Sequence, residues 1–120
     1  MTRLGSVSVV AVLVVLLTVA LAGQSKDVTI KGEVLDQHCF MIHHGKGPDH
    51  AACSNACMSR NISIGFLAES GQFYLLLGDQ MLTVKDQVAG MAGKPATVTG
   101  AIVERDGFKA IQMKKIELGK

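Results

Sequence analysis

Apolar and polar residues alternate along parts of the chain or gather in short apolar runs between turn residues, and both patterns are typical of β-strands. Residues 28–34 (VTIKGEV) give the clearest alternation. The pattern predicts five main strands, over residues 28–34, 62–68, 72–77, 96–104 and 108–118. In the last of these, the apolar positions change parity between Met113 and Ile116, which predicts a β-bulge near Lys114 and Lys115.

Turn residues between these strands predict two hairpins. Residues 69–71 (Glu-Ser-Gly) separate the second and third strands, and residues 105–107 (Arg-Asp-Gly) separate the fourth and fifth. Residues 81–84 follow a Gly-Asp turn and predict a further short strand.

Two segments carry helix signals instead. Pro48 suits the first turn of a helix, where its missing N–H costs nothing, and Asp49 suits the positive helix end. We therefore expect a helix over residues 49–60, closed by Asn61. Two helical turns are expected over residues 85–91, because glycine and proline follow at once.

The order of these elements predicts a mainly β domain. Five strands with a short helix between the third and fourth match a small OB-like barrel. The helix at residues 49–60 then belongs to an insertion of about residues 38–60 between the first and second strands. OB folds use that connection for binding, so a ligand site is expected in this insertion.

The N-terminal segment reads as an export signal. Arg3 precedes an apolar run over residues 7–22, which ends in Ala20-Leu21-Ala22, an A-x-A cleavage pattern. The run is shorter than the roughly 20 residues that span a bilayer, although an uncleaved anchor is the alternative. We expect residues 1–22 to be a signal peptide and residues 23–120 to form one domain, exported to the periplasm or secreted.

Charge and aromatic content argue against a nucleic-acid partner. The formal net charge is +2, and removing Arg3 with the signal leaves +1. The chain has four Phe, one Tyr and no Trp, which leaves little for a stacking platform. Membrane association is expected only if the N-terminal segment stays attached, and a protein partner is left open.

Soft ligands are concentrated in one segment. The three cysteines and four histidines of the chain all fall within residues 38–57. Export places the cysteines in an oxidising compartment, where unprotected thiols form disulfides. Because three is an odd number, at least one sulfur is free, pairs with another molecule or binds a ligand.

Spacing predicts that part of this cluster shares one helix face. His50, Cys53 and Cys57 stand at i, i+3 and i+7, so their side chains form one stripe. Cys39, expected at the end of the first strand, and His44, expected in a loop, can fold back onto that stripe. Three thiolates and one imidazole form the Cys₃His set of a tetrahedral zinc site.

Copper is the alternative metal to zinc. Thiolates and thioethers select copper(I), and two methionines, Met41 and Met58, lie beside the cluster in the sequence. The cofactor expected is therefore a zinc or copper ion, held by a set drawn from Cys39, His44, His50, Cys53 and Cys57.

Two other interpretations of the cysteines stay open. A disulfide from Cys39 to Cys53 or Cys57 would staple the helix to the barrel and contribute about 2–4 kcal/mol. Thiol redox chemistry is weaker, because the chain lacks a C-x-x-C motif. No nucleophile elbow or paired carboxylates accompany the histidines, so the sequence favours a binding protein over an enzyme.

The chain resembles a group of small exported, largely uncharacterised bacterial proteins. The resemblance lies in Gly32-Glu33-Val34 leading to Asp36 and Cys39, followed by an H-G-x-G-P-x-H-x-x-C-x-x-x-C stretch from His44 to Cys57. Residues 93–100 are similar to the barrel strands of the group. The resemblance implies an exported OB-like domain with a Cys/His site and no particular reaction; His38 and His43 are outside the shared pattern.

Overall fold

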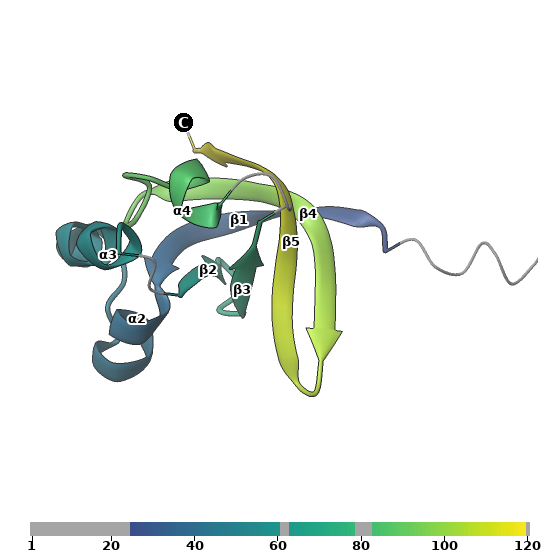
Figure 1. The fold of residues 1–120 in the computed structure, drawn as a ribbon, viewed down its shortest axis with the longest axis horizontal. Helices are drawn as coiled ribbons and strands as arrows, with labels where there is room; N and C mark the ends of the chain where they lie inside the picture. The colour runs from purple at the N-terminus through teal and green to yellow at the C-terminus, as the bar shows by residue number, and fades with distance from the viewer. Residues whose placement is uncertain (1–24, 61–62, 79–82, 120) are drawn as a thin grey trace, which may run out of the picture.

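The computed structural model describes residues 25–60, 63–78 and 83–119. Its strands form one mixed sheet that closes in a ring in the order β1, β2, β3, β5, β4. β3 and β5 pair in parallel, and the other pairs are antiparallel (Figure 1). The strands are β1 (Asp27–Asp36), β2 (Ile64–Ala68), β3 (Phe73–Leu77), β4 (Pro95–Arg105) and β5 (Phe108–Leu118). The predicted mainly β, five-stranded architecture is confirmed.

Helices lie in two of the connections, as predicted. Between β1 and β2 the chain forms α2 (Gln37–His43), the 3₁₀ helix η1 (Pro48–His50) and α3 (Ala51–Met58). Between β3 and β4 it forms α4 (Val84–Gln87). Figure 1 shows α2 and α3 side by side at the end of β1. Within the described ranges, no helix is both long and apolar enough to cross a membrane.

Several element boundaries differ from those expected. The helix predicted over residues 49–60 begins as a 3₁₀ turn at Pro48 and continues as α3 only to Met58. The helix predicted over residues 85–91 is shorter, and it begins at Val84, a residue expected in a strand. Asn61, Met81 and Leu82 lie outside the described residues. The seven-residue helix α2 was not predicted.

β1 is the strand that joins the two sides of the ring. It pairs with β4 over Asp27 to Glu33 and with β2 over Gly32 to Asp36. Gly32 lies where the two pairings overlap, and a Cβ placed on it would come within 2.1 Å of the Leu67 carbonyl oxygen. A side chain at position 32 would therefore force the backbones of β1 and β2 apart, so glycine is required here.

The predicted bulge in β5 is confirmed. Thr99 pairs with Lys115, whereas the next residue of β4, Gly100, pairs with Met113. Lys114 is therefore the extra residue, and it shifts the register between the two halves of the strand. Because of this shift, Met113 and Ile116 both turn toward the interior, although they differ in parity.

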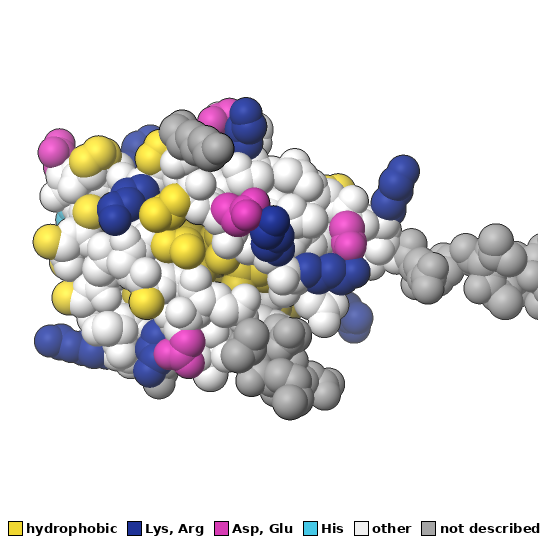
Figure 2. Space-filling model, turned by 90° about the horizontal axis from the view of Figure 1, so that it is seen from above, with side chains coloured by type: hydrophobic (Ala, Val, Ile, Leu, Met, Phe, Trp, Pro, Cys, Tyr) yellow, Lys and Arg dark blue, Asp and Glu magenta, His cyan; other side chains and the backbone are white. Residues whose placement is uncertain are grey.

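The core lies inside the ring. Its largest fully buried apolar side chains come mostly from the strands, with one from the segment after α4: Val34, Phe66, Val88, Val98, Ile111 and Met113. Met58 of α3 joins this core, so the inserted segment is anchored at its last helical residue. On the face shown in Figure 2, a band of hydrophobic side chains lies among Lys, Arg, Asp and Glu side chains.

Candidate metal centre

Asp36 ends β1 and begins α2. Its backbone is extended (φ −75°, ψ 125°), and its Oδ1 accepts a hydrogen bond from the Cys39 backbone N–H at 2.7 Å. An aspartate that accepts from the third residue of a helix is a standard N-cap. Cys39 is therefore in the first turn of α2 and not at the end of a strand, as had been expected. The turn directs Cys39 inward, where it is 5 % exposed.

The loop after α2 brings the chain back toward the same place. His44 ends α2 in the left-handed conformation (φ 53°), and the Gly45 N–H donates to the Cys39 carbonyl at 3.0 Å. The Gly47 N–H then donates to Glu33 Oε2 of β1 at 2.8 Å. These bonds fix the start of η1 close to the strand that precedes α2.

The predicted helical stripe faces Cys39. The Cys39 Sγ lies 3.7 Å from the Cys53 Sγ and 4.0 Å from the Cys57 Sγ. A ring nitrogen of His50 is within 4.8 Å of the Cys39 and Cys53 sulfurs. The structure thus brings Cys39, His50, Cys53 and Cys57 into one Cys/His cluster that can hold a metal ion.

Asp36 adds a carboxylate to this cluster. One of its oxygens lies within 4.8 Å of both the Cys39 and Cys57 sulfurs. Asp36 is fully buried, and its Oδ2 has no hydrogen-bond partner among the described residues. Asp36 was not predicted as a ligand. The signal for it was the Asp-x-x-Cys spacing, which is that of a capping residue three positions before a buried thiol.

The donor atoms fall into two groups that share one residue. The first consists of Cys39, His50 and Cys53, and the second of Asp36, Cys39 and Cys57; within each, the ligand atoms lie within 4.8 Å of one another. Exposure differs between the groups, because Cys53 is exposed whereas Asp36 is buried and Cys57 half-buried. Cys39 therefore lies between an outer and an inner group.

Electrostatics keep the central thiol protonated in the metal-free protein. The adjacent Asp36 carboxylate and burial raise the pKa of Cys39 to about 12, and the contacts with Cys53 and Cys57 act in the same direction. Both causes disfavour a second negative charge in a site that already holds one. A cation placed among these groups would remove that penalty.

Gly45 makes room for the His50 ring. A Cβ on Gly45 would lie 2.4 Å from the Cδ2 and 2.5 Å from the Nε2 of His50. The His50 Nε2 is buried and has no hydrogen-bond partner within the described structure. The glycine between α2 and η1 therefore permits the position of the imidazole.

The other histidines and the two methionines lie apart from the cluster. His44, a predicted ligand, is exposed at the end of α2 and belongs to neither donor group. His38 and His43 meet edge to face on α2 with ring centroids 6.3 Å apart. Met58 is in the hydrophobic core, and Met41 is 63 % exposed. The structure thus gives no thioether support to the copper alternative.

All three cysteines lie within the described residues, and each is a free thiol. The Cys39 sulfur lies 3.7 Å from that of Cys53 and 4.0 Å from that of Cys57, whereas a disulfide requires about 2.05 Å. The arrangement is therefore one of adjacent thiols around Cys39.

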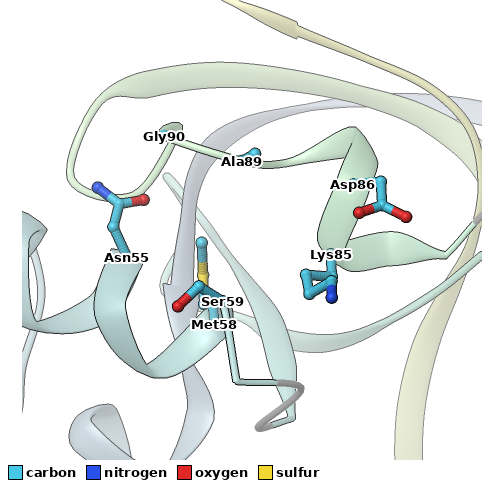
Figure 3. Close-up of a pocket in the computed structure, with 7 residues that line it drawn as sticks. All are labelled: Asn55, Met58, Ser59, Lys85, Asp86, Ala89 and Gly90. Carbon is cyan, nitrogen blue, oxygen red and sulfur yellow. The ribbon is translucent and has the colours of Figure 1, made fainter.

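A separate pocket lies on the other side of α3. It has a volume of about 280 Å³ and is lined by Asn55, Met58 and Ser59 of the α3 segment and by Lys85, Asp86, Ala89 and Gly90 around α4 (Figure 3). Asn55 also ties the two segments together, since its Oδ1 accepts from the Ala92 N–H at 3.2 Å. This pocket contains no Cys or His, so it is distinct from the cluster.

Comparison of the chain with protein-family models, with curated proteins and with solved structures gave no match. The functional argument therefore depends on the geometry of the site.

Proposed function

We propose that the protein is an exported metal-binding module whose Cys/His cluster holds zinc or copper through Cys39, Cys53, Cys57 and His50. The observation that carries the proposal is the fully buried Asp36 carboxylate. One of its oxygens lies within 4.8 Å of the Cys39 and Cys57 sulfurs, and its Oδ2 has no hydrogen-bond partner among the described residues. An unpaired buried charge costs several kcal/mol. A metal ion compensates that charge and converts the thiols to thiolate ligands.

The sulfur spacing supports this proposal. With Zn–S bonds of about 2.3 Å, neighbouring sulfurs around a tetrahedral ion are about 3.8 Å apart. The distances from the Cys39 sulfur, 3.7 and 4.0 Å, fall on either side of that value. Two thiols in van der Waals contact have a similar spacing, so the sulfur distances alone do not distinguish a metal site from packed thiols. The carboxylate and the imidazole beside the sulfurs favour the metal site.

Zinc fits the donor set better than copper(I). The cluster combines thiolates with an imidazole and a carboxylate, which are all zinc ligands. Copper(I) is selected by sulfur ligands, and the methionines nearest in sequence do not extend the sulfur set. His44 is exposed at the end of α2, and it would bind the ion only after a movement of the chain.

Metal analysis of the purified protein, combined with counting of free thiols, tests the proposal. We expect stoichiometric metal and three thiols that react only after a chelator is added. Cys53→Ser should lower the metal content, whereas His38→Ala, on an exposed face of α2, should not. One reactive thiol and no metal would establish the disulfide alternative instead.

Thiol redox activity is the second candidate function, favoured by the contact of Cys39 with both other sulfurs. A reactive cysteine needs a lowered pKa, as at a helix N-terminus. Cys39 is in the first turn of α2, but the Asp36 carboxylate and burial raise its pKa to about 12. This places Cys39 among the unreactive thiols and makes metal binding the stronger proposal.

We further infer an OB-type barrel and an exported location. The ring order, with β1 between β2 and β4 and a parallel β3–β5 pair, supports the OB assignment. The cluster then occupies the connection between strands one and two, in keeping with the resemblance to small exported bacterial proteins. Export depends on the N-terminal apolar run, which precedes the described residues.

A further inference from the structure

We infer that the cluster is a two-ion site in which the Cys39 thiolate bridges an outer ion, bound by His50 and Cys53, and an inner ion, bound by Asp36 and Cys57. The inference rests on the proposed metal-binding function and specifies its stoichiometry and ligands.

Geometry gives the first argument. In a tetrahedral site every pair of ligand atoms must be close to every other, about 3.8 Å apart for sulfur. Among the described donors, the sets that meet a 4.8 Å limit are Cys39 with His50 and Cys53, and Cys39 with Asp36 and Cys57. Cys39 is common to both sets, and neither set includes Cys53 and Cys57 together. A single ion would require the cluster to rearrange, whereas two ions fit the donors as they lie.

Charge gives the second argument. Coordinated as three thiolates and one carboxylate, the cluster carries four negative charges beside a neutral imidazole. One divalent ion would leave two negative charges uncompensated next to the fully buried Asp36. Two divalent ions neutralise the site. Because an unpaired buried charge is costly, the neutral two-ion state is favoured.

Each ion then has three ligands from the protein. Three protein ligands leave a coordination position for water or another small donor, which is the arrangement of open zinc sites. The outer position lies beside the exposed Cys53, so ions enter and exchange on that side. The inner ion, held by a buried carboxylate and a half-buried thiolate, exchanges more slowly.

Titration of the full chain with zinc under reducing conditions, followed by native mass spectrometry, tests the inference. We expect two zinc ions per chain. Asp36→Asn keeps an oxygen that can accept from the Cys39 N–H, and asparagine is as good an N-cap as aspartate, so this variant removes charge without removing the cap. It should lose one ion, as should Cys57→Ser and, on the other side, Cys53→Ser.

The outcomes separate the two proposals. A chain that binds neither zinc nor copper(I) overturns both. One ion that Cys53→Ser and Cys57→Ser each abolish supports metal binding and overturns the two-ion inference. A second ion that disappears in the His38→Ala, His43→Ala double variant would lie on the surface of α2 and would also overturn it.

Cobalt(II) tests the shared ligand directly. A bridging thiolate couples the spins of two cobalt ions antiferromagnetically, so the paramagnetic resonance signal from the first equivalent should fall as the second is added. A signal that grows in proportion to the cobalt added would overturn the bridge, even with two ions bound.

Discussion

The ring of strands and the inserted segment between β1 and β2 are stabilised by different means. Every strand of the ring contributes buried side chains to a common interior, and its backbone groups pair with neighbours on both sides. In the insertion, α2 buries only Cys39, η1 buries no residue, and α3 buries Ser54 and Met58. Apolar burial therefore accounts for the ring, whereas the insertion depends on polar contacts, sulfur and, in our proposal, metal.

Contacts of several kinds connect the two regions, including the stacking of Phe40 of α2 on Phe73 of β3 with ring centroids 5.4 Å apart. The Gly47 N–H donates to Glu33 Oε2 of β1, and the Ala92 N–H donates to Asn55 Oδ1 of α3. Met58 is the one residue of α2, η1 and α3 among the buried members of the hydrophobic core. The comparison indicates that the candidate site is carried by a segment that contributes few side chains to the hydrophobic core.

A core truncation should have the largest effect. Phe66 of β2 is fully buried, so Phe66→Ala should lower the free energy of unfolding by about 3–5 kcal/mol, through lost apolar contacts and the cavity that remains. Denaturant unfolding with metal present measures this. A loss below about 1 kcal/mol would contradict the view that the ring interior holds the domain together.

Metal removal should have the next largest effect, and it should destabilise only the insertion. A ligand at a hundredfold excess over its Kd stabilises the state that binds it by about 2.7 kcal/mol. Chelation should therefore speed amide exchange in residues 37–58 by about 100-fold, as measured by mass spectrometry of peptides. Exchange in β4 and β5 provides the internal control. Equal acceleration in those strands would mean that the two regions unfold together.

A substitution at Gly45 should have a smaller effect, confined to the site. Gly45→Ala places a methyl group against the His50 ring and should lower zinc affinity by about 10- to 100-fold, the range for residues that orient a ligand. Competition with a chromogenic chelator measures this affinity. Lys46→Ala, an exposed neighbour in the same loop, is the matched control. An unchanged affinity in Gly45→Ala would show that His50 does not bind the ion.

Periodicity predicted the ring more completely than the insertion. Alternation and short apolar runs between turn residues located all five strands, and a change of parity located the bulge at Lys114. The helix stripe was also predicted, since spacing alone decides which side chains share a helix face.

The missed features have a common cause. α2 has only seven residues; it is capped by Asp36, and it packs through Cys39 against α3 and through Phe40 against Phe73 of β3. The contacts with α3 and β3 join segments that are far apart in the sequence, so spacing does not reveal them, whereas the Asp36 cap follows from the Asp-x-x-Cys spacing. Spacing likewise does not reveal Asp36 as a candidate ligand, because one of its oxygens comes within 4.8 Å of the Cys57 sulfur only once α2 and α3 are in place.

The two ends of the insertion meet. The Gln37 N–H, at the start of α2, donates to the Ser63 carbonyl at 3.0 Å, and the adjacent Asp36 and Ile64 are paired across β1 and β2. To the rest of the sheet, the insertion is thus equivalent to the connection of an ordinary β-hairpin. A protein engineer could transplant the insertion, together with its capping aspartate, onto the paired ends of another antiparallel hairpin. The transplant would include the whole Cys/His cluster.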